Sequence, residues 1–254
     1  MTQPEAIDLV GQTVLVTGAT RGIGQAVALE LAAAGARVAI HGRSAAGAAD
    51  VAAALGAAHA GTFLADLGTP AGCESLVTAA TSALPAIDAL VLIAGADVLT
   101  GDPAKWTFER KLDELLRVDV MATLLLARAF GRWMRDHAGG SIVTIGWDQA
   151  HTGMEGDSGE LFAATKGAVM AFTKSLAKSL APQVRVNCVA PGWIRTAWGE
   201  GASEAWQQRA VRESMLGRWG TPEDIACAVH WLVSPRAGFV TGQVIAVNGG
   251  FRSA

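Results

Sequence analysis

The sequence predicts a three-layer α/β fold, in which helices cover both faces of a doubly wound, mostly parallel, seven-stranded sheet. Three observations support this prediction. Short runs of apolar and β-branched residues recur along the chain, helical patterns separate them, and a glycine-rich turn directly follows the first run. Because this alternation continues without a linker or a repeat, we expect a single domain over residues 1–254.

Each candidate strand is a continuous apolar run, as is typical of strands buried on both faces of a parallel sheet. The predicted strands are Thr13–Thr17, Arg37–His41, Thr62–Ala65, Ala89–Ile93, Ser141–Ile145, Arg185–Val189 and Gln243–Val247. Between them, Ile23, Val27 and Leu31 have the spacing of one apolar helix face. Near the C-terminus, residues 221–224 supply an N-cap, a proline in the first turn and acidic residues at the positive end of a helix.

Two segments interrupt the alternation of strands and helices. Residues 147–161 follow the fifth strand and residues 193–220 follow the sixth, and we interpret both as long irregular loops. Open α/β sheets bind ligands beyond the carboxyl ends of their strands. We therefore expect these two segments to contact the substrate.

Charge and cysteine content narrow the range of partners. A formal net charge of −3 gives no basic footprint, so we expect neither nucleic acid nor an anionic membrane as a partner. Cys73, Cys188 and Cys227 include no Cys-x-x-Cys pair and are predicted to be buried apolar side chains. The first residues lack a signal-peptide pattern, and the longest apolar run, residues 89–96, is far shorter than the ~20 residues of a membrane helix. We therefore expect a cytoplasmic protein.

The glycine-rich turn, residues 17–24, closes the first strand and opens the first helix. Glycines permit a tight turn and a close approach of the backbone to a pyrophosphate, whose charge then meets the free N–H groups at the helix start. The alternative is a tight strand-to-helix turn that binds no ligand. On the first interpretation, a dinucleotide contacts Gly18, Thr20, Arg21, Gly22, Ile23 and Gly24.

The Gly-x-x-x-Gly-x-Gly spacing of this turn resembles that of the short-chain dehydrogenase/reductase family, and the resemblance runs along the entire chain. Further matching positions are Asp66-Leu67, Ala94-Gly95, Arg185–Asn187, Pro191–Thr196, Gly217-Arg218, Thr221–Ala226 and Val247–Gly250. The resemblance implies a Rossmann fold that binds a nicotinamide dinucleotide. It also implies cofactor contacts from Asp66, Leu67, Ala94, Gly95, Lys166, Pro191, Gly192, Ile194 and Thr196.

The residues after the second strand favour NADP(H). A carboxylate there would bind the 2′-hydroxyl of NAD and repel a 2′-phosphate, but this chain has His41-Gly42-Arg43-Ser44. The guanidinium of Arg43, with Arg21 in the glycine-rich turn, suits a phosphate. We therefore predict that His41, Gly42, Arg43 and Ser44 contact NADP(H). The alternative is that Arg43 is a solvated loop residue.

The catalytic positions depart from the pattern that the resemblance implies. Members of the family use a tyrosine, a lysine four residues later, a serine and an asparagine. Lys166 matches the lysine, but Phe162 stands at the tyrosine position and the chain contains no tyrosine. Trp147 stands at the serine position and Asp119 at the asparagine position, while Leu92-Ile93 replaces two asparagines of another motif. We interpret the site as repurposed.

The source of a catalytic proton is therefore open, and Asp148 is the leading candidate. Apolar surroundings beside Trp147 would raise its pKa, although the carboxylate is alternatively a loop cap held by hydrogen bonds. His151 is a second candidate, or a solvated loop residue. Asp119 is expected to take over the helix-bending and water-holding role of the asparagine, or alternatively to pair as a buried carboxylate with a cation such as Lys166.

Acidic and aromatic residues of the two interrupting segments indicate a substrate class. Glu155, Asp157 and Glu160 would attract an amine, an iminium ion or a protonated heterocycle, or alternatively form a solvated surface. Rigid tryptophan rings would stack on a planar substrate and exclude water. The predicted substrate pocket comprises Trp147, Asp148, His151, Phe162, Trp193 and Trp198.

Three functions agree with these residues. The first is an NADPH-dependent oxidoreductase that reduces a C=O or C=N bond of a small cyclic or aromatic substrate, pterin-like or an imine, with a non-standard proton donor. The second is a catalytically silent NADP(H)-binding protein, and the third is a non-redox lyase or isomerase. The resemblance also implies a homotetramer, or a dimer, built on helices around Lys111–Asp136 and Phe162–Ala181.

Overall fold

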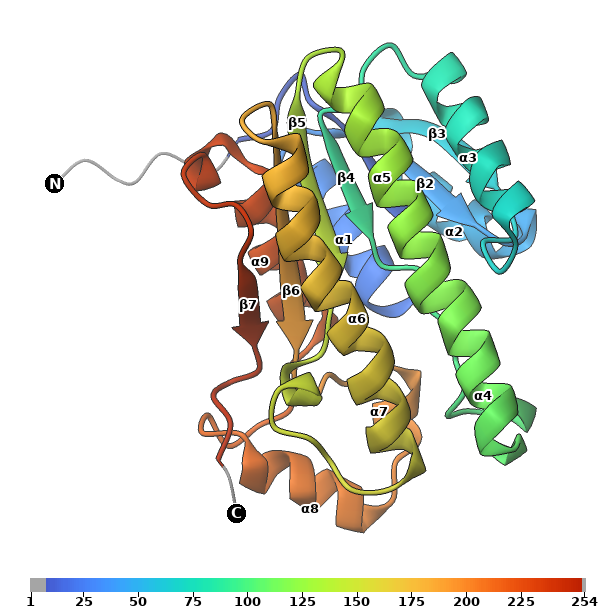
Figure 1. The fold of residues 1–254 in the computed structure, drawn as a ribbon, viewed down its shortest axis with the longest axis vertical. Coiled ribbons are helices and arrows are strands. Elements are labelled where there is room, and N and C mark those ends of the chain that lie inside the picture. Colours follow the sequence, from blue (N-terminus) through green and yellow to red (C-terminus); the bar gives the residue numbers. More distant parts are fainter. Residues whose placement is uncertain (1–7, 253–254) are drawn as a thin grey trace, which may run out of the picture.

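The structure, a computed structural model, describes residues 8–252. Its centre is a sheet of seven parallel strands in the order β3-β2-β1-β4-β5-β6-β7 (Figure 1). The strands are β1 (Thr13–Thr17), β2 (Arg37–Gly42), β3 (His59–Leu64), β4 (Ala89–Leu92), β5 (Gly140–Ile145), β6 (Val184–Pro191) and β7 (Val244–Val247). Each predicted strand is present, so the doubly wound α/β fold is confirmed.

Helices connect the strands and form the outer layers. They are α1 (Gly22–Ala33), α2 (Ala45–Leu55), α3 (Pro70–Ala83), α4 (Phe108–Leu115), α5 (Ala122–Arg135), α6 (Asp157–Leu180), α7 (Ala197–Gly201), α8 (Glu204–Glu213) and α9 (Pro222–Val233). Short 3₁₀ turns lie at Gly56–Ala58, Asp102–Lys105, Asp148–Ala150 and Pro235–Ala237. A π-helical turn, Leu116–Met121, joins α4 to α5.

Two apolar cores lie on the two faces of the sheet. Helices α1, α2 and α9 cover one face, and α3, α5 and α6 cover the other (Figure 1). Along β1, Val14 and Val16 pack into the first core and Leu15 into the second, as alternation along a strand requires. Unlike the inner strands, β3 and β7 are only partly buried, because they lie at the two edges of the sheet.

The prediction of two irregular loops is wrong for the second of them. Residues 193–220 contain α7 and α8, whereas residues 147–161 stay largely non-helical until α6 begins at Asp157. Helix α8 is short and mostly polar, and Ala210 is its only buried residue, so it offers few of the apolar residues by which a helix is predicted. Cys73 and Cys188 are buried as predicted, but Cys227 is exposed because it lies on the face of α9 opposite Ile225.

Across residues 8–252, none of the helices combines the length and the apolar character that crossing a membrane requires.

The winding of the sheet reverses between β1 and β4, and this reversal positions the site. From β1 the chain builds β2 and β3 on one side, and β4 to β7 on the other. The Thr17 hydroxyl oxygen at the end of β1 accepts hydrogen bonds from the N–H groups of Ile93 (3.1 Å) and Ala94 (3.2 Å), just after β4. Connections that leave the sheet in opposite directions open a crevice at the carboxyl ends of these strands.

Helix α9 begins with the N-cap that the sequence predicts. The Thr221 hydroxyl accepts from the Asp224 N–H (3.4 Å), and the Asp224 carboxylate accepts from the Thr221 N–H (2.8 Å). We expect Thr221→Ala to lower the free energy of unfolding by about 1 kcal/mol, because a helix-start N–H loses its acceptor. Urea denaturation measures this change. Thr221→Ser keeps the hydroxyl and should retain most of the stability; equal losses in both variants would contradict the capping role.

Candidate active site

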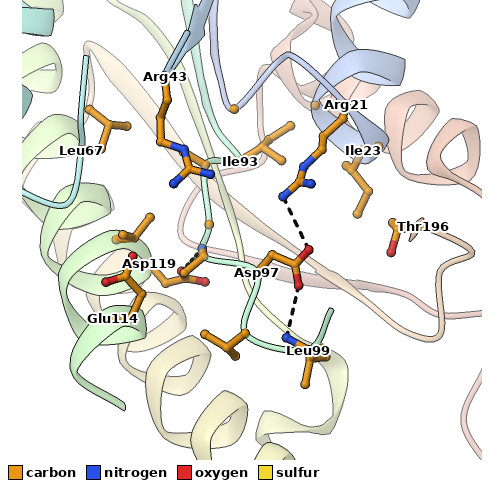
Figure 2. A pocket seen from close by; sticks show the side chains of 18 of the residues that line it. Arg21, Ile23, Arg43, Leu67, Ile93, Asp97, Leu99, Glu114, Asp119 and Thr196 are labelled. Carbon is orange, nitrogen blue, oxygen red and sulfur yellow. Dashed lines mark hydrogen bonds and ion pairs between the residues drawn. The ribbon is translucent and has the colours of Figure 1, made fainter. Parts of the chain in front are cut away.

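A cleft of about 690 Å³ opens at the carboxyl ends of β1, β2 and β4 (Figure 2). Many residues predicted to bind a cofactor line it: Gly18, Thr20, Arg21, Gly22, Ile23, Gly24, His41, Gly42, Arg43, Asp66, Leu67, Ala94, Gly95, Lys166 and Thr196. The predicted contacts Ser44, Pro191, Gly192 and Ile194 do not line it. Pro191 and Ile194 are buried instead, and the Ser44 hydroxyl accepts from the Gly47 N–H (3.3 Å) as the N-cap of α2.

The glycine-rich turn brings bare backbone to the cleft. Gly18 has φ = +65°, and a Cβ there would lie 2.7 Å from the Cα of Ala94, so only glycine permits this close approach. Gly22 has φ = +52°, and the nearest described atom to its Cβ position is the Thr196 methyl carbon, at 3.8 Å. The start of α1 is therefore open to the cleft, as a site for an anionic diphosphate requires.

His41 contributes to the cleft wall by holding the backbone in place. Its Nδ1 accepts from the Gly18 N–H (3.3 Å), so its proton lies on Nε2, which donates to the Ala65 carbonyl oxygen (3.1 Å). Burial lowers the pKa of His41, and the Arg43 charge acts in the same direction, against the opposing effect of the Ala65 hydrogen bond. The imidazole is therefore neutral, and it joins the ends of β1, β2 and β3.

Two guanidinium groups, those of Arg21 and Arg43, belong to the lining of the cleft. Arg21 and Arg43 both line it, and Figure 2 shows both side chains extending into the space between the surrounding elements. Arg21 forms an ion pair with Asp97, 3.6 Å away, on the segment that follows β4. Arg43 is exposed and lies at the end of β2, where the sequence predicts a phosphate contact.

Helix α6 places Lys166 and Phe162 in the same cleft, one helical turn apart. The Lys166 ammonium lies 2.8 Å from the Asp119 carboxylate, with the side chains 14% and 2% exposed. The second oxygen of Asp119 accepts from the Ala96 N–H (2.8 Å). The predicted pairing of Asp119 with Lys166 is therefore present in the structure. Asp119 also lies in the π-helical turn between α4 and α5, and its helix-bending and water-holding role stays a prediction.

The leading candidate for a proton donor, Asp148, does not line the cleft. Its carboxylate accepts from the side-chain amide of Asn248 (3.0 Å) and from the Gln149 N–H (2.8 Å). Burial raises its pKa, as expected, although these hydrogen bonds oppose the shift. Trp147 packs against Phe162 with ring centroids 6.3 Å apart, and His151 is exposed. Neither Trp147 nor His151 lines the cleft.

The predicted stacking of substrate on several tryptophans does not fit the structure. Trp193, Trp198, Trp206 and Trp219 form one cluster with ring centroids 5.5–6.2 Å apart, and of these only Trp198 lines the cleft. The Trp193 Nε1–H donates to the Glu213 carboxylate (2.8 Å), so this ring is held inside the cluster. Packing of the four rings against one another therefore holds Trp193 away from the cleft, whereas Trp198 packs in the cluster and also lines the cleft.

The acidic segment before α6 also lies elsewhere than expected. Glu155 pairs with Arg209 of α8 (2.6 Å), and none of Glu155, Asp157 and Glu160 lines the cleft. The carboxylates that do line it are Asp66, Asp97, Glu114 and Asp119. The acidic residues that the sequence assigns to a cationic substrate therefore lie outside the cleft.

The segment between β4 and α4 is the part of the site that the sequence analysis missed. Residues 96–100, Pro103 and Trp106 of this segment line the cleft. The signal was available, because residues 93–107 are another long connection at the carboxyl end of a predicted strand.

The residues of the cleft fit a nicotinamide dinucleotide. The open turn at Gly22 and the start of α1 offer N–H groups to a diphosphate, and two guanidinium groups lie beside them. Apolar Leu67 and Ile93 also line the cleft, as does Lys166, whose ammonium can donate to hydroxyl groups.

Known proteins match this chain over nearly its whole length. The sequence model of the family described as "Enoyl-(Acyl carrier protein) reductase" matches residues 18–252. The 3-oxoacyl-[acyl-carrier-protein] reductase FabG of Aquifex aeolicus is 37% identical over 255 residues, covering 96% of this chain and 98% of that protein. Galactitol 2-dehydrogenase (L-tagatose-forming) of Cereibacter sphaeroides is 35% identical over 253 residues, covering 96% of each.

A solved structure has a similar fold over nearly the whole chain. The 3-oxoacyl (acyl-carrier-protein) reductase of Agrobacterium tumefaciens, crystallised with NADP bound, superposes with a TM-score of 0.87 at 30% identity, covering 98% of both chains. By its fold, its glycine-rich turn and these matches, the chain belongs to the short-chain dehydrogenase/reductase family of NAD(P)-dependent oxidoreductases.

Proposed function

We propose that this protein is an NADP(H)-dependent reductase that acts on a small cyclic or aromatic substrate, pterin-like or an imine, and that its preferred reaction is reduction of a protonated C=N bond. The observation that carries the proposal is Phe162, which lines the cleft one turn before Lys166 without a hydroxyl group to donate a proton. We propose that it replaces the catalytic tyrosine of the family, as Trp147 and Asp119 replace the serine and the asparagine.

The preference for the phosphorylated cofactor rests on charge. Arg43 directly follows β2, in a His-Gly-Arg-Ser stretch that contains no carboxylate, and Arg21 lines the same cleft. A family member with NADP bound supports the choice. When bound, NADPH supplies the hydride, and the backbone of the glycine-rich turn, the two arginines and Lys166 would hold it.

The chain's own residues then orient the substrate and exclude water. Asp119 keeps the Lys166 ammonium in one position, since the pair is buried at 2.8 Å. Trp106, Trp198 and Phe162 give the cleft flat apolar surfaces suited to a planar ring. Asp97 and Glu114 also line the cleft, and each is paired with an arginine: Asp97 with Arg21 (3.6 Å) and Glu114 with Arg117 (2.7 Å).

A protonated imine reconciles Phe162 with catalysis. A ketone acquires negative charge on oxygen as hydride adds to its carbon, and it needs an acid. An iminium ion needs none, because its C=N π electrons become the nitrogen lone pair and its charge is neutralised.

Self-association as a homotetramer or dimer and a cytoplasmic location also stay proposals. Leu116 and Leu125 are exposed on the continuous stretch formed by α4, the π-helical turn and α5, and they support a contact surface there.

We expect Arg43→Gln to weaken NADPH binding by about tenfold or more while leaving NADH binding nearly unchanged, because a charge-assisted hydrogen bond to phosphate is lost. Quenching of tryptophan fluorescence measures both affinities. Arg37→Gln is the matched control, since Arg37 is exposed at the opposite end of the same strand. Equal weakening of both cofactors would contradict a phosphate contact at Arg43.

We expect the protein to oxidise NADPH rapidly with cyclic imines and only slowly with ketones. The fall in NADPH absorbance measures both rates. The kcat/KM for an imine should rise as the pH falls toward the pKa of the substrate and then level off. Phe162→Tyr should increase ketone reduction by about 10²-fold or more, since it adds an acid, whereas Phe162→Leu should not. Rapid ketone reduction by the unaltered protein would refute the preference for C=N, and NADPH binding without any turnover would favour the catalytically silent alternative.

Asp148→Asn separates the two interpretations of the buried carboxyl group. A general acid contributes about 10²- to 10⁴-fold to a rate, so a loss of that size would restore Asp148 as the proton donor. We expect imine reduction to be retained, because Asp148 does not line the cleft and its oxygens accept from Asn248 and Gln149. Steady-state kinetics of the variant measure its rate of imine reduction. A thermal melting curve of the same variant reports any loss of stability.

A further inference from the structure

An ion pair links the two walls of the proposed cofactor cleft. Arg21 extends from the glycine-rich turn, and Asp97 lies on the segment after β4 (Figure 2). The guanidinium and carboxylate groups are 3.6 Å apart, and both side chains line the cleft. A residue predicted to bind phosphate therefore already has an anionic partner.

The two members of the pair differ in freedom. One Asp97 oxygen accepts from the N–H groups of Leu99 (3.2 Å) and Thr100 (3.0 Å), and the other accepts from the Thr100 hydroxyl (2.5 Å). Asp97 is thus held by its own loop, with 28% of its side chain exposed. The Arg21 side chain is 65% exposed, and Asp97 is its ion-pair partner within the described residues, so Arg21 is the group free to move.

Asp97 carries its charge under ordinary conditions. Burial alone would raise its pKa, but the hydrogen bonds from Thr100 and Leu99 and the charge of Arg21 together hold the pKa below its ordinary value. Since an anionic ligand of Arg21 would approach this carboxylate, the two anions compete for one guanidinium.

We propose that Asp97 is the counter-ion of Arg21 in the nucleotide-free protein and that a phosphate group of NADP(H) must displace it, so that Asp97 limits the affinity for the cofactor. This inference rests on the proposed function. Asp97 would then tune the affinity for NADP(H) through its ion pair with Arg21. When the nucleotide binds, the Arg21 guanidinium would exchange the Asp97 carboxylate for a phosphate group.

Calorimetric titration of the full chain with NADP⁺ at low ionic strength tests the proposal. We expect Asp97→Asn to lower the Kd by about two- to fivefold, the range typical of an exposed ion pair. Asparagine keeps an oxygen for the N–H groups of Leu99 and Thr100, so the loop retains its acceptor. The gain should shrink at about 0.5 M salt, where exposed charges are screened.

A double-mutant cycle assigns the effect to the pair. In an Arg21→Gln background, Asp97→Asn should give no further gain, because the two substitutions act through one interaction. Asp102→Asn is the matched control: it removes the same charge from the same segment, but Asp102 pairs with Lys105 (3.5 Å) and does not line the cleft. It should leave the Kd unchanged.

The outcomes separate this inference from the proposed function. Unchanged or weaker NADP⁺ binding by Asp97→Asn, or a gain that persists without Arg21, would overturn the counter-ion role and leave the proposed function standing. No NADP⁺ binding by the unaltered protein would overturn both.

Discussion

The shape of the cleft depends on the close approach of two backbone segments, the turn that follows β1 and the segment that follows β4. Gly18 lies so near Ala94 that a Cβ would come within 2.7 Å of its Cα, and the Thr17 hydroxyl accepts two N–H groups of the same segment. The Gly18 N–H also donates a hydrogen bond to Nδ1 of His41. Because these contacts set the spacing of the glycine-rich turn and the segment after β4, they also set where the cleft charges meet, including Arg21 and Asp97.

Paired charges organise the cleft from one end to the other. Lys166 and Asp119 form a buried pair, for which loss of one partner would leave an uncompensated charge in a desolvated position. Arg21 and Asp97 form an exposed pair, which costs little to break. The buried pair therefore suits a fixed binding group, and the exposed pair suits an exchange of ligands.

Some site residues were predictable because their signal is local. The glycine-rich turn, Arg43 after β2, and Lys166 four residues after Phe162 are recognised from neighbours in the sequence, and all of these line the cleft. For Asp148 the sequence left two roles open and could not identify the hydrogen-bond partner Asn248, because Asn248 lies 100 residues away. Likewise, nothing near Glu155 indicates that α8 brings Arg209 to it.

The sequence by itself determined the seven strands, the parallel doubly wound fold, the turn that opens α1 and the cap of α9, since each depends on apolar runs, spacing or caps within a few residues. Only the tertiary structure decided which charges are paired, which tryptophans pack against one another and which carboxylates face the cleft. The physical reason is the distance along the chain over which each interaction acts. Backbone preferences act between sequence neighbours, whereas charge pairing and ring packing depend on distances that are set only when helices and loops from distant parts of the chain pack together.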